Sequence, residues 1–185
     1  MEKQHGPWKI KSTEKIYENE FIRVNEDSVI KPDNKPGKYT TVSTKPGAAT
    51  LLIDDEKNVY LTRQFRYALG KESIEVVAGG IEEGENPLET AKKEVKEELG
   101  IEAEEWTEYG SLNTDTSIIK SPAYLFLARK LKFEESDQEG SEKIKMAKMS
   151  LDEAVEKVLK TEITHATSCY LILKAHFLLG EDGKN

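Results

Sequence analysis

The segment from Ala78 to Ile101 constrains the fold of this chain more than any other, because a glycine-rich loop leads directly into a well-delimited helix. Asn86 is a favourable N-cap, Pro87 suits the first helical position, and Gly100 can end the helix. These signals predict a helix over residues 87–99. One face of that helix carries the apolar side chains that can pack on a sheet, namely Leu88, Ala91, Val95 and Leu99.

Three carboxylates, Glu94, Glu97 and Glu98, share the adjacent face of the predicted helix. Like charges three or four positions apart destabilise a helix, and anions near its C-terminal end oppose the helix dipole. A divalent cation would remove both penalties. The chain has one cysteine and three histidines, so these oxygen donors suit Mg²⁺ or Mn²⁺ better than zinc.

The loop before the helix strengthens the indication of a ligand site. A predicted strand over residues 73–78 is followed by Gly79, Gly80 and, further on, Gly84. A backbone without side chains can approach a ligand closely. Together with the carboxylate face, the loop predicts an arrangement that holds a metal and a diphosphate.

The remaining chain is rich in strand patterns. Residues 8–43 alternate polar and apolar positions, which predicts short antiparallel strands joined by a turn at residues 31–38. Residues 48–53 and 59–65 predict a hairpin, and residues 123–131 predict another strand. Helical spacing recurs at residues 151–159 and 163–179, and the acidic stretch 134–142 predicts an exposed loop.

Composition excludes several classes of protein. A length of 185 residues fits one domain of ordinary size, and a net charge of -8 gives no basic surface for binding nucleic acid. Cys169 is the only cysteine, so no internal disulfide can form. Residues 1–12 contain no apolar signal core, and no apolar run is long enough to cross a membrane. We therefore expect a cytoplasmic protein.

The segment that begins at Gly79 resembles the conserved box of the Nudix hydrolases. Eight of the nine fixed places of the box match, and Lys93 stands where the family has arginine. Lysine keeps the positive charge but lacks the bidentate fork of arginine. The matching residues are Gly79, Glu85, Glu94, Val95, Glu97, Glu98, Gly100 and Ile101.

The flanking segments resemble the ADP-ribose pyrophosphatase branch of this family, over about residues 8–178. The resemblance rests on residues 61–67 (LTRQFRY), 74–79 (IEVVAG) and 163–178, and on the strand-rich N-terminus. It implies an α/β fold, an α/β/α sandwich around a mixed sheet. It also implies a homodimer whose N-terminal strands help to build the neighbour's substrate site. We expect residues 1–45 to form this strand segment, 46–180 the Nudix domain and 181–185 a tail.

The resemblance also implies roles for individual residues. The Ala78 carbonyl and the carboxylates of Glu94, Glu97 and Glu98 would bind the metal, and Arg66 would contact the diphosphate beside Gly79. Glu142 matches the place of a catalytic carboxylate, with Asp137 and Glu139 as rivals in the same loop. The box glutamates Glu94 and Glu97 remain alternative bases.

Three other side chains have a functional and a structural interpretation. Trp8 would stack on a nucleobase or pack at the dimer interface. Arg63 is expected to point to the same side of its strand as Arg66 and to join it at the phosphates, although strand arginines are often merely solvated. His165, at the start of an apolar segment, fits a capping or packing role better than that of a base.

These features predict a Mg²⁺-dependent hydrolase that cleaves the diphosphate of a nucleoside diphosphate sugar with water. The ADP-ribose branch usually has a Pro-Gly pair where this chain has Thr116 and Ser117, so the predicted substrate is this wider class rather than ADP-ribose alone. The alternatives are hydrolysis of a nucleoside triphosphate or a dinucleoside polyphosphate, or a Nudix module that binds nucleotides without turnover.

Overall fold

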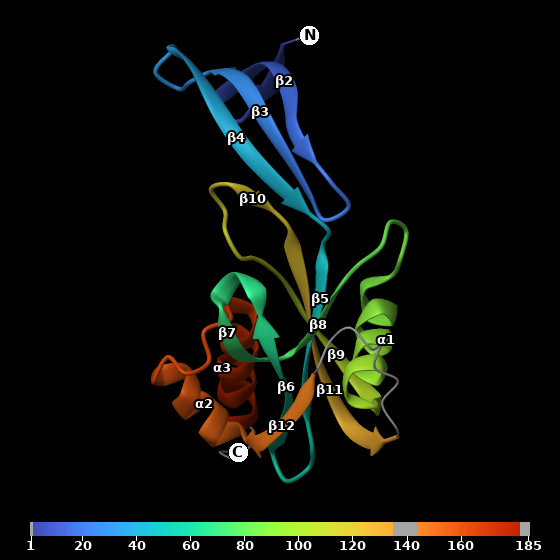
Figure 1. Ribbon diagram of the computed structural model, residues 1–185. Coiled ribbons are helices and arrows are strands. Elements are labelled where there is room, and N and C mark those ends of the chain that lie inside the picture. Colours follow the sequence, from blue (N-terminus) through green and yellow to red (C-terminus); the bar gives the residue numbers. More distant parts are fainter. Residues whose placement is uncertain (1, 135–143, 182–185) are drawn as a thin grey trace. The chain divides into compact units, whose positions relative to one another are not determined.

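The computed structural model describes residues 2–134 and 144–181, which fall into two compact units (Figure 1). Unit 1 belongs to Met1–Lys45 and Asn113–Pro122. Unit 2 belongs to Pro46–Leu112 and Ala123–Asn185. The short segment 113–122 therefore groups with the N-terminal strands, although it lies far from them in the sequence.

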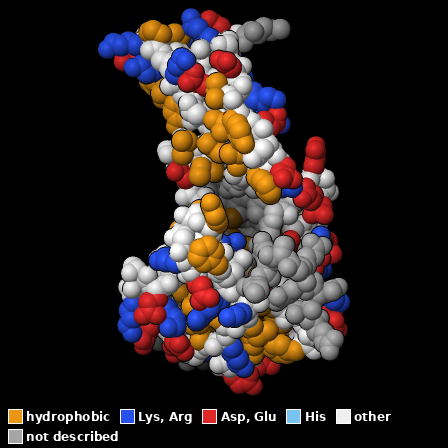
Figure 2. Space-filling model, in the orientation of Figure 1, with side chains coloured by type: hydrophobic (Ala, Val, Ile, Leu, Met, Phe, Trp, Pro, Cys, Tyr) orange, Lys and Arg blue, Asp and Glu red, His pale blue; other side chains and the backbone are white. Residues whose placement is uncertain are grey.

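Unit 1 is a five-stranded sheet, in which all neighbouring strands are antiparallel except the parallel pair of β4 and β10. Among its described residues only Val29 is a buried hydrophobic side chain. Figure 2 shows hydrophobic side chains on the visible face of this unit. In spatial order the strands are β1 (Lys3–His5), β2 (Trp8–Glu18), β3 (Ile22–Ile30), β4 (Pro36–Thr44) and β10 (Ile119–Lys120).

Unit 2 is built on a mixed sheet, because β5 pairs in parallel with β11 and antiparallel with β6. Near the turn that joins them, β5 and β6 pair with each other at Leu52–Tyr60 and Ile53–Val59. Away from that turn they separate, so that residues 47–50 of β5 pair with β8 and residues 62–66 of β6 pair with β7. The strands are β5 (Gly47–Ile53), β6 (Asn58–Arg66), β7 (Lys71–Glu75), β8 (Val77–Gly80), β9 (Ile101–Asn113), β11 (Pro122–Phe133) and β12 (Lys145–Ser150).

Helices cover both faces of this sheet, which confirms the predicted α/β/α sandwich (Figure 1). Helix α1 (Pro87–Leu99) packs Val95 and Leu99 onto one face. Helix α3 (Ala166–Glu181) packs Leu171 and Ile172 into the core on the other face, where α2 (Leu151–Leu159) also lies. No helix among the described residues is long and apolar enough to span a membrane.

The predicted bounds of α1 and α2 are confirmed, but α3 begins three residues later than predicted. Thr161 adopts a positive φ of 58°, and Ile163 is buried in the core ahead of the helix. The single strand predicted over residues 73–78 was also wrong. It divides at Val76, because β7 and β8 pair with two different strands.

Candidate active site

Helix α1 begins and ends where its capping residues predict. The Asn86 side chain accepts a hydrogen bond from the Leu88 amide at 2.9 Å, and Gly100 has a left-handed φ of 62°. The Gly100 amide donates to the Lys96 carbonyl at 2.9 Å. These contacts fix the rotation of the helix and hence the direction of its carboxylate face.

Glu85 of the box holds the loop against the first turn of the helix. Its Oε2 atom accepts from the Glu82 amide at 3.2 Å and from the Thr90 hydroxyl at 3.0 Å. Gly84 in the same loop has a φ of 85°, which a side chain would strain. Glu85, which matches a fixed place of the Nudix box, therefore has a structural role in this chain.

Gly79 and Glu94 lie in direct contact, as the predicted site requires. A Cβ atom at residue 79 would come within 2.1 Å of the Glu94 carboxyl carbon and 2.2 Å of its Oε1 atom. Glycine leaves free the space that the Glu94 carboxylate occupies, and a side chain at residue 79 would displace that carboxylate. The contact joins strand β8 to the middle of α1.

Glu97 and Glu98 follow on the same helix and are half-buried, and the Oε2 atom of Glu98 is itself buried. Lys93 Nζ lies 3.9 Å from Glu97 Oε1, at the outer limit of an ion pair. The Lys93 side chain is 61% exposed, so it supplies a loose point charge rather than a clamp.

No three or more His, Cys, Asp or Glu side chains converge into a metal-binding group within residues 2–134 and 144–181. The available donors nevertheless fit a divalent cation of the Mg²⁺ type. They are hard oxygen atoms from half-buried carboxylates on one helix face, close to the glycine-rich end of β8. Glu94 already packs against that backbone at Gly79.

Arg66, at the end of β6, forms an ion pair with Glu75 at the end of β7. Its Nη2 atom donates to Glu75 Oε2 at 2.6 Å, and its Nε atom lies 3.2 Å from both carboxylate oxygens. Burial raises the pKa of the Glu75 carboxyl, but hydrogen bonds from Arg66 and Ser73 outweigh burial, so its pKa is lowered. Glu75 is therefore a buried anion that orients Arg66.

His165, in the segment before α3, lies beside the same acidic side chain, Glu75. Its Nδ1 atom lies 2.8 Å from the Ser168 hydroxyl and 3.7 Å from Glu75 Oε2. The Ser168 hydroxyl accepts a hydrogen bond from the Val76 amide at 2.9 Å. Burial lowers the pKa of His165, although the Glu75 charge opposes that shift.

The expectation that Arg63 and Arg66 point to the same side of β6 was wrong. Side chains three positions apart on a strand point to opposite faces. Arg63 lies opposite Ile74 and is exposed, whereas Arg66 is half-buried beside Glu75. The two arginines therefore do not form a single cationic pair.

The other predicted residues have separate locations. Trp8 belongs to unit 1, where its ring contacts Tyr39 edge-on at a centroid distance of 5.4 Å. Ala78 lies in β8 and is half-buried. The loop candidates Asp137, Glu139 and Glu142 lie outside the described residues.

Sequence reasoning missed Glu75 and Ser168 as members of this site. The available signal was a charged residue inside the otherwise apolar run 74–78, because a buried acid needs a partner. The identity of that partner could not be read locally. Val76 and Ser168 are 92 positions apart in the sequence.

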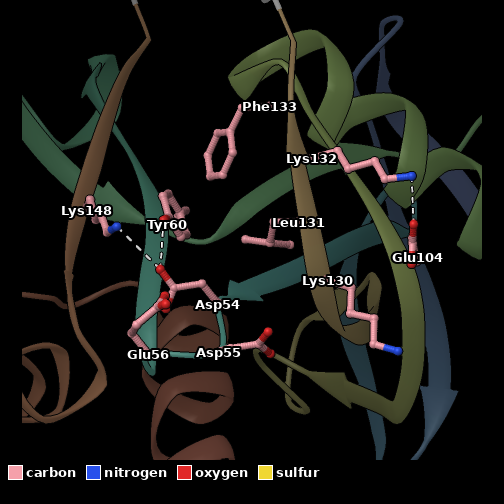
Figure 3. Close-up of a pocket in the computed structure, with 10 residues that line it drawn as sticks. All are labelled: Asp54, Asp55, Glu56, Tyr60, Glu104, Lys130, Leu131, Lys132, Phe133 and Lys148. Carbon is pink, nitrogen blue, oxygen red and sulfur yellow. Dashed lines mark hydrogen bonds and ion pairs between the residues drawn. The ribbon is translucent and has the colours of Figure 1, made fainter.

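A separate hollow of about 440 Å³ opens on unit 2 beside the β5–β6 turn (Figure 3). The Tyr60 hydroxyl and Lys148 converge on Asp54 there, at 2.8 and 3.4 Å. The lysines on the facing strand are themselves paired, Lys130 with Glu105 and Lys132 with Glu104. The hollow contains none of the predicted site residues.

Comparisons with known proteins identify the family of this chain. Residues 43–168 match the model of the NUDIX domain, and the chain therefore belongs to the Nudix family of hydrolases, enzymes that generally use divalent metal ions. Residues 8–42 match the model of the nucleoside diphosphate sugar hydrolase N-terminal domain.

Two individual relatives and one solved structure are also similar to this chain. The chain is 29% identical to the ADP-ribose pyrophosphatase of Bacillus subtilis (strain 168), over 86% of this chain and 87% of the relative. It is 28% identical to the methanol dehydrogenase activator of Bacillus methanolicus, over 82% and 83% of the two chains. A crystal structure of an ADP compounds hydrolase shares the fold, with a TM-score of 0.80 and 18% identity over 95% of this chain and 96% of that one.

Proposed function

We propose that this protein hydrolyses the diphosphate linkage of nucleoside diphosphate sugars such as ADP-ribose. The products would be a nucleoside monophosphate and a sugar phosphate. The observation that carries the proposal is the contact of Glu94 with Gly79, which joins the carboxylate face of α1 to the glycine-rich end of β8. The match of residues 8–42 to a nucleoside diphosphate sugar hydrolase domain supports this substrate class.

The metal-binding residues in this proposal are the Ala78 carbonyl and the carboxylates of Glu94, Glu97 and Glu98. Mg²⁺ or Mn²⁺ bound there would neutralise the diphosphate oxygens and lower the pKa of the attacking water. The protein contributes the position of its donors: α1 directs the three carboxylates, and Gly79 leaves room for Glu94 beside the backbone.

Arg66 is the proposed diphosphate contact on the protein side. Its pairing with the buried Glu75 limits the directions in which the guanidinium can point, and a fixed donor stabilises developing phosphate charge better than a flexible one. Arg63 points to the opposite face of β6, so a phosphate role for it would need a separate group of the substrate.

The proton acceptor is proposed to be Glu142, with Glu97 or Glu94 as the alternative. A loop carboxylate could approach the attacking water after the substrate has bound. Replacing Glu142 by Gln should then reduce turnover by at least about tenfold at saturating Mg²⁺, whereas Glu139→Gln should not. Equal turnover of both variants and the parent would assign the base to the helix.

Unit 1 is proposed to bind a second copy of the chain and to contribute to its substrate site. Its sheet has little buried apolar surface, while Tyr17, Phe21, Tyr39 and Ile118 are each at least 37% exposed. Two of these side chains, Tyr39 and Ile118, line one hollow of this unit and provide it with an apolar surface for association. Trp8 and Tyr39 line a hollow of about 540 Å³ on this unit, where Trp8 would stack on a nucleobase or pack against the partner.

A single cysteine is compatible with a cytoplasmic enzyme.

A substrate panel tests the proposal. ADP-ribose, other nucleoside diphosphate sugars, nucleoside triphosphates and dinucleoside polyphosphates should be incubated with Mg²⁺ or Mn²⁺ and the products separated by chromatography. The highest kcat/KM is expected for a nucleoside diphosphate sugar. A preference for triphosphates or polyphosphates would refute the substrate class, and calorimetric binding without turnover would indicate a binding module.

A further inference from the structure

Three elements of unit 2 meet at the buried carboxylate of Glu75, which is 4% exposed. Arg66 approaches it from the end of β6, and His165 approaches it from the segment before α3. Ser168, fully buried in the first turn of α3, links His165 to the amide of Val76. Val76 is the residue between β7 and β8, two positions before Ala78.

The Val76 amide fixes one of the hydrogen-bond directions in this group. That amide can only donate, so the Ser168 oxygen accepts its hydrogen bond at 2.9 Å. After accepting this bond, the Ser168 hydroxyl keeps one hydrogen and one lone pair, and its oxygen lies 2.8 Å from His165 Nδ1. When the hydroxyl donates that hydrogen to Nδ1, the imidazole is a neutral acceptor with its own hydrogen on Nε2.

We propose that His165 is a positioning residue for the diphosphate site. As a neutral acceptor it orients Ser168, which holds the β7–β8 turn, and it leaves the Glu75 carboxylate to Arg66. This inference rests on the proposed function, because it assigns Arg66 to the diphosphate of the substrate. It goes beyond that proposal by giving an indirect role to a histidine that touches neither the substrate nor the metal.

The alternative state of the group shows why neutrality matters. A proton on Nδ1 would remove the acceptor for Ser168 and place a cation 3.7 Å from Glu75 Oε2. This cation would compete with Arg66, which is the other charged group facing Glu75 at 2.6 Å. Burial of His165, which lowers its pKa, favours the neutral state.

The first test is nuclear magnetic resonance of nitrogen-15-labelled full-length protein at pH 7.5. The chain has three histidines, and the His165→Phe variant identifies the His165 signals by their loss. We expect Nδ1 to be unprotonated in the parent and to lose its hydrogen-bonded shift in Ser168→Ala. A protonated Nδ1 in the parent would overturn the inference.

The second test compares three variants by steady-state kinetics with ADP-ribose and Mg²⁺. His165→Phe removes the acceptor and should raise KM about three- to tenfold, the range expected for one lost hydrogen bond, with kcat within about twofold of the parent. His165→Asn keeps an acceptor oxygen and should restore KM. His176→Asn is the matched control, because His176 is an exposed histidine that contacts Asp152 on the surface.

The results separate this inference from the proposed function. A parental KM in His165→Phe, or equal impairment of His165→Phe and His165→Asn, would refute the positioning role. A parent that hydrolyses no nucleoside diphosphate sugar would instead refute the proposed function, and with it the assignment of Arg66 to a diphosphate. The resonance experiment decides the state of His165 in either case.

Discussion

Replacing Gly79 by Ala should separate catalysis from folding. The added Cβ would lie 2.1 Å from the Glu94 carboxyl carbon and 2.4 Å from its Cγ atom. Carbon atoms in contact normally lie about 3.5–4.0 Å apart. The Glu94 carboxylate must therefore move by more than about 1 Å.

The expected cost falls on turnover rather than stability. The clashing atoms are Cγ, Cδ and Oε1 of Glu94, and this half-buried side chain can move away by rotating about its Cα–Cβ bond. Gly79 has no positive φ, so alanine adds no backbone strain at this position. A displacement of about 1 Å in a reacting group can reduce the rate about a hundredfold. We expect that loss in kcat/KM, with a melting temperature close to that of the parent.

The assay is hydrolysis of ADP-ribose at saturating Mg²⁺, with thermal unfolding measured on the same samples. Gly47→Ala is the matched control, because Gly47 lies on the neighbouring strand and its Cβ would meet only the Gly79 carbonyl, at 3.7 Å. Gly79→Ala combined with Glu94→Ala should be no slower than Glu94→Ala alone. Parental activity in Gly79→Ala would refute the claim that Glu94 acts from the position described.

Three further predictions concern stability, the metal site and assembly. Burial raises the pKa of Asp54, but hydrogen bonds from Asn58, Tyr60 and Lys148 lower it to about 2. Because this folded-state pKa lies below the unfolded value, Asp54→Asn should lower the free energy of unfolding in urea by about 2 kcal/mol at pH 7. The difference from the parent should disappear as the pH falls from about 4 to 2, and a difference independent of pH would contradict this prediction. Glu98→Gln should reduce turnover and weaken Mn²⁺ binding in calorimetry while raising the melting temperature without metal, because it removes a like charge from α1; unchanged Mn²⁺ affinity would exclude Glu98 from the metal. Light scattering should give a dimer at micromolar concentration, and a fully active monomer would exclude a shared site.

The sequence predicted the region around α1 well because its signals are local. Asn86, Pro87 and Gly100 define the helix by their own backbone preferences, and the spacing of the glutamates places them on one face. The contact between Gly79 and Glu94 then follows from the packing of α1 beside β8, which the sandwich imposes. Short-range rules are sufficient for this part of the molecule.

The sequence did not predict β9 or β12, for a different physical reason. Most side chains of β9 are at least partly exposed, and β12 carries Lys145 and Lys148 and pairs with a single neighbour, β6, in the described sheet. Charged edge strands lack the apolar alternation that identifies a strand. Their assignment depends on the partner strand rather than on their own residues.

The pairing of Arg66 with Glu75 was also beyond local reasoning. Both residues stand on the hairpin of β6 and β7, whose turn contains Gly70 with a φ of 65°. The register places Arg66 opposite Lys71, and only its long side chain reaches along the strand to Glu75. His165 lies beside Glu75 because of the packing of α3, a long-range contact that the residues near Glu75 in the sequence do not predict.

The measurement that tests the central claim most directly is the quantitative release of AMP from ADP-ribose by the full-length protein. With Mg²⁺, we expect AMP and ribose 5-phosphate in equal amounts, with no activity in excess chelator and restoration by Mn²⁺. Glu97→Gln should lower the rate by several orders of magnitude while retaining the parental circular dichroism spectrum. Undiminished AMP release in excess chelator, or by Glu97→Gln, would contradict a metal-dependent reaction directed by the carboxylates of α1.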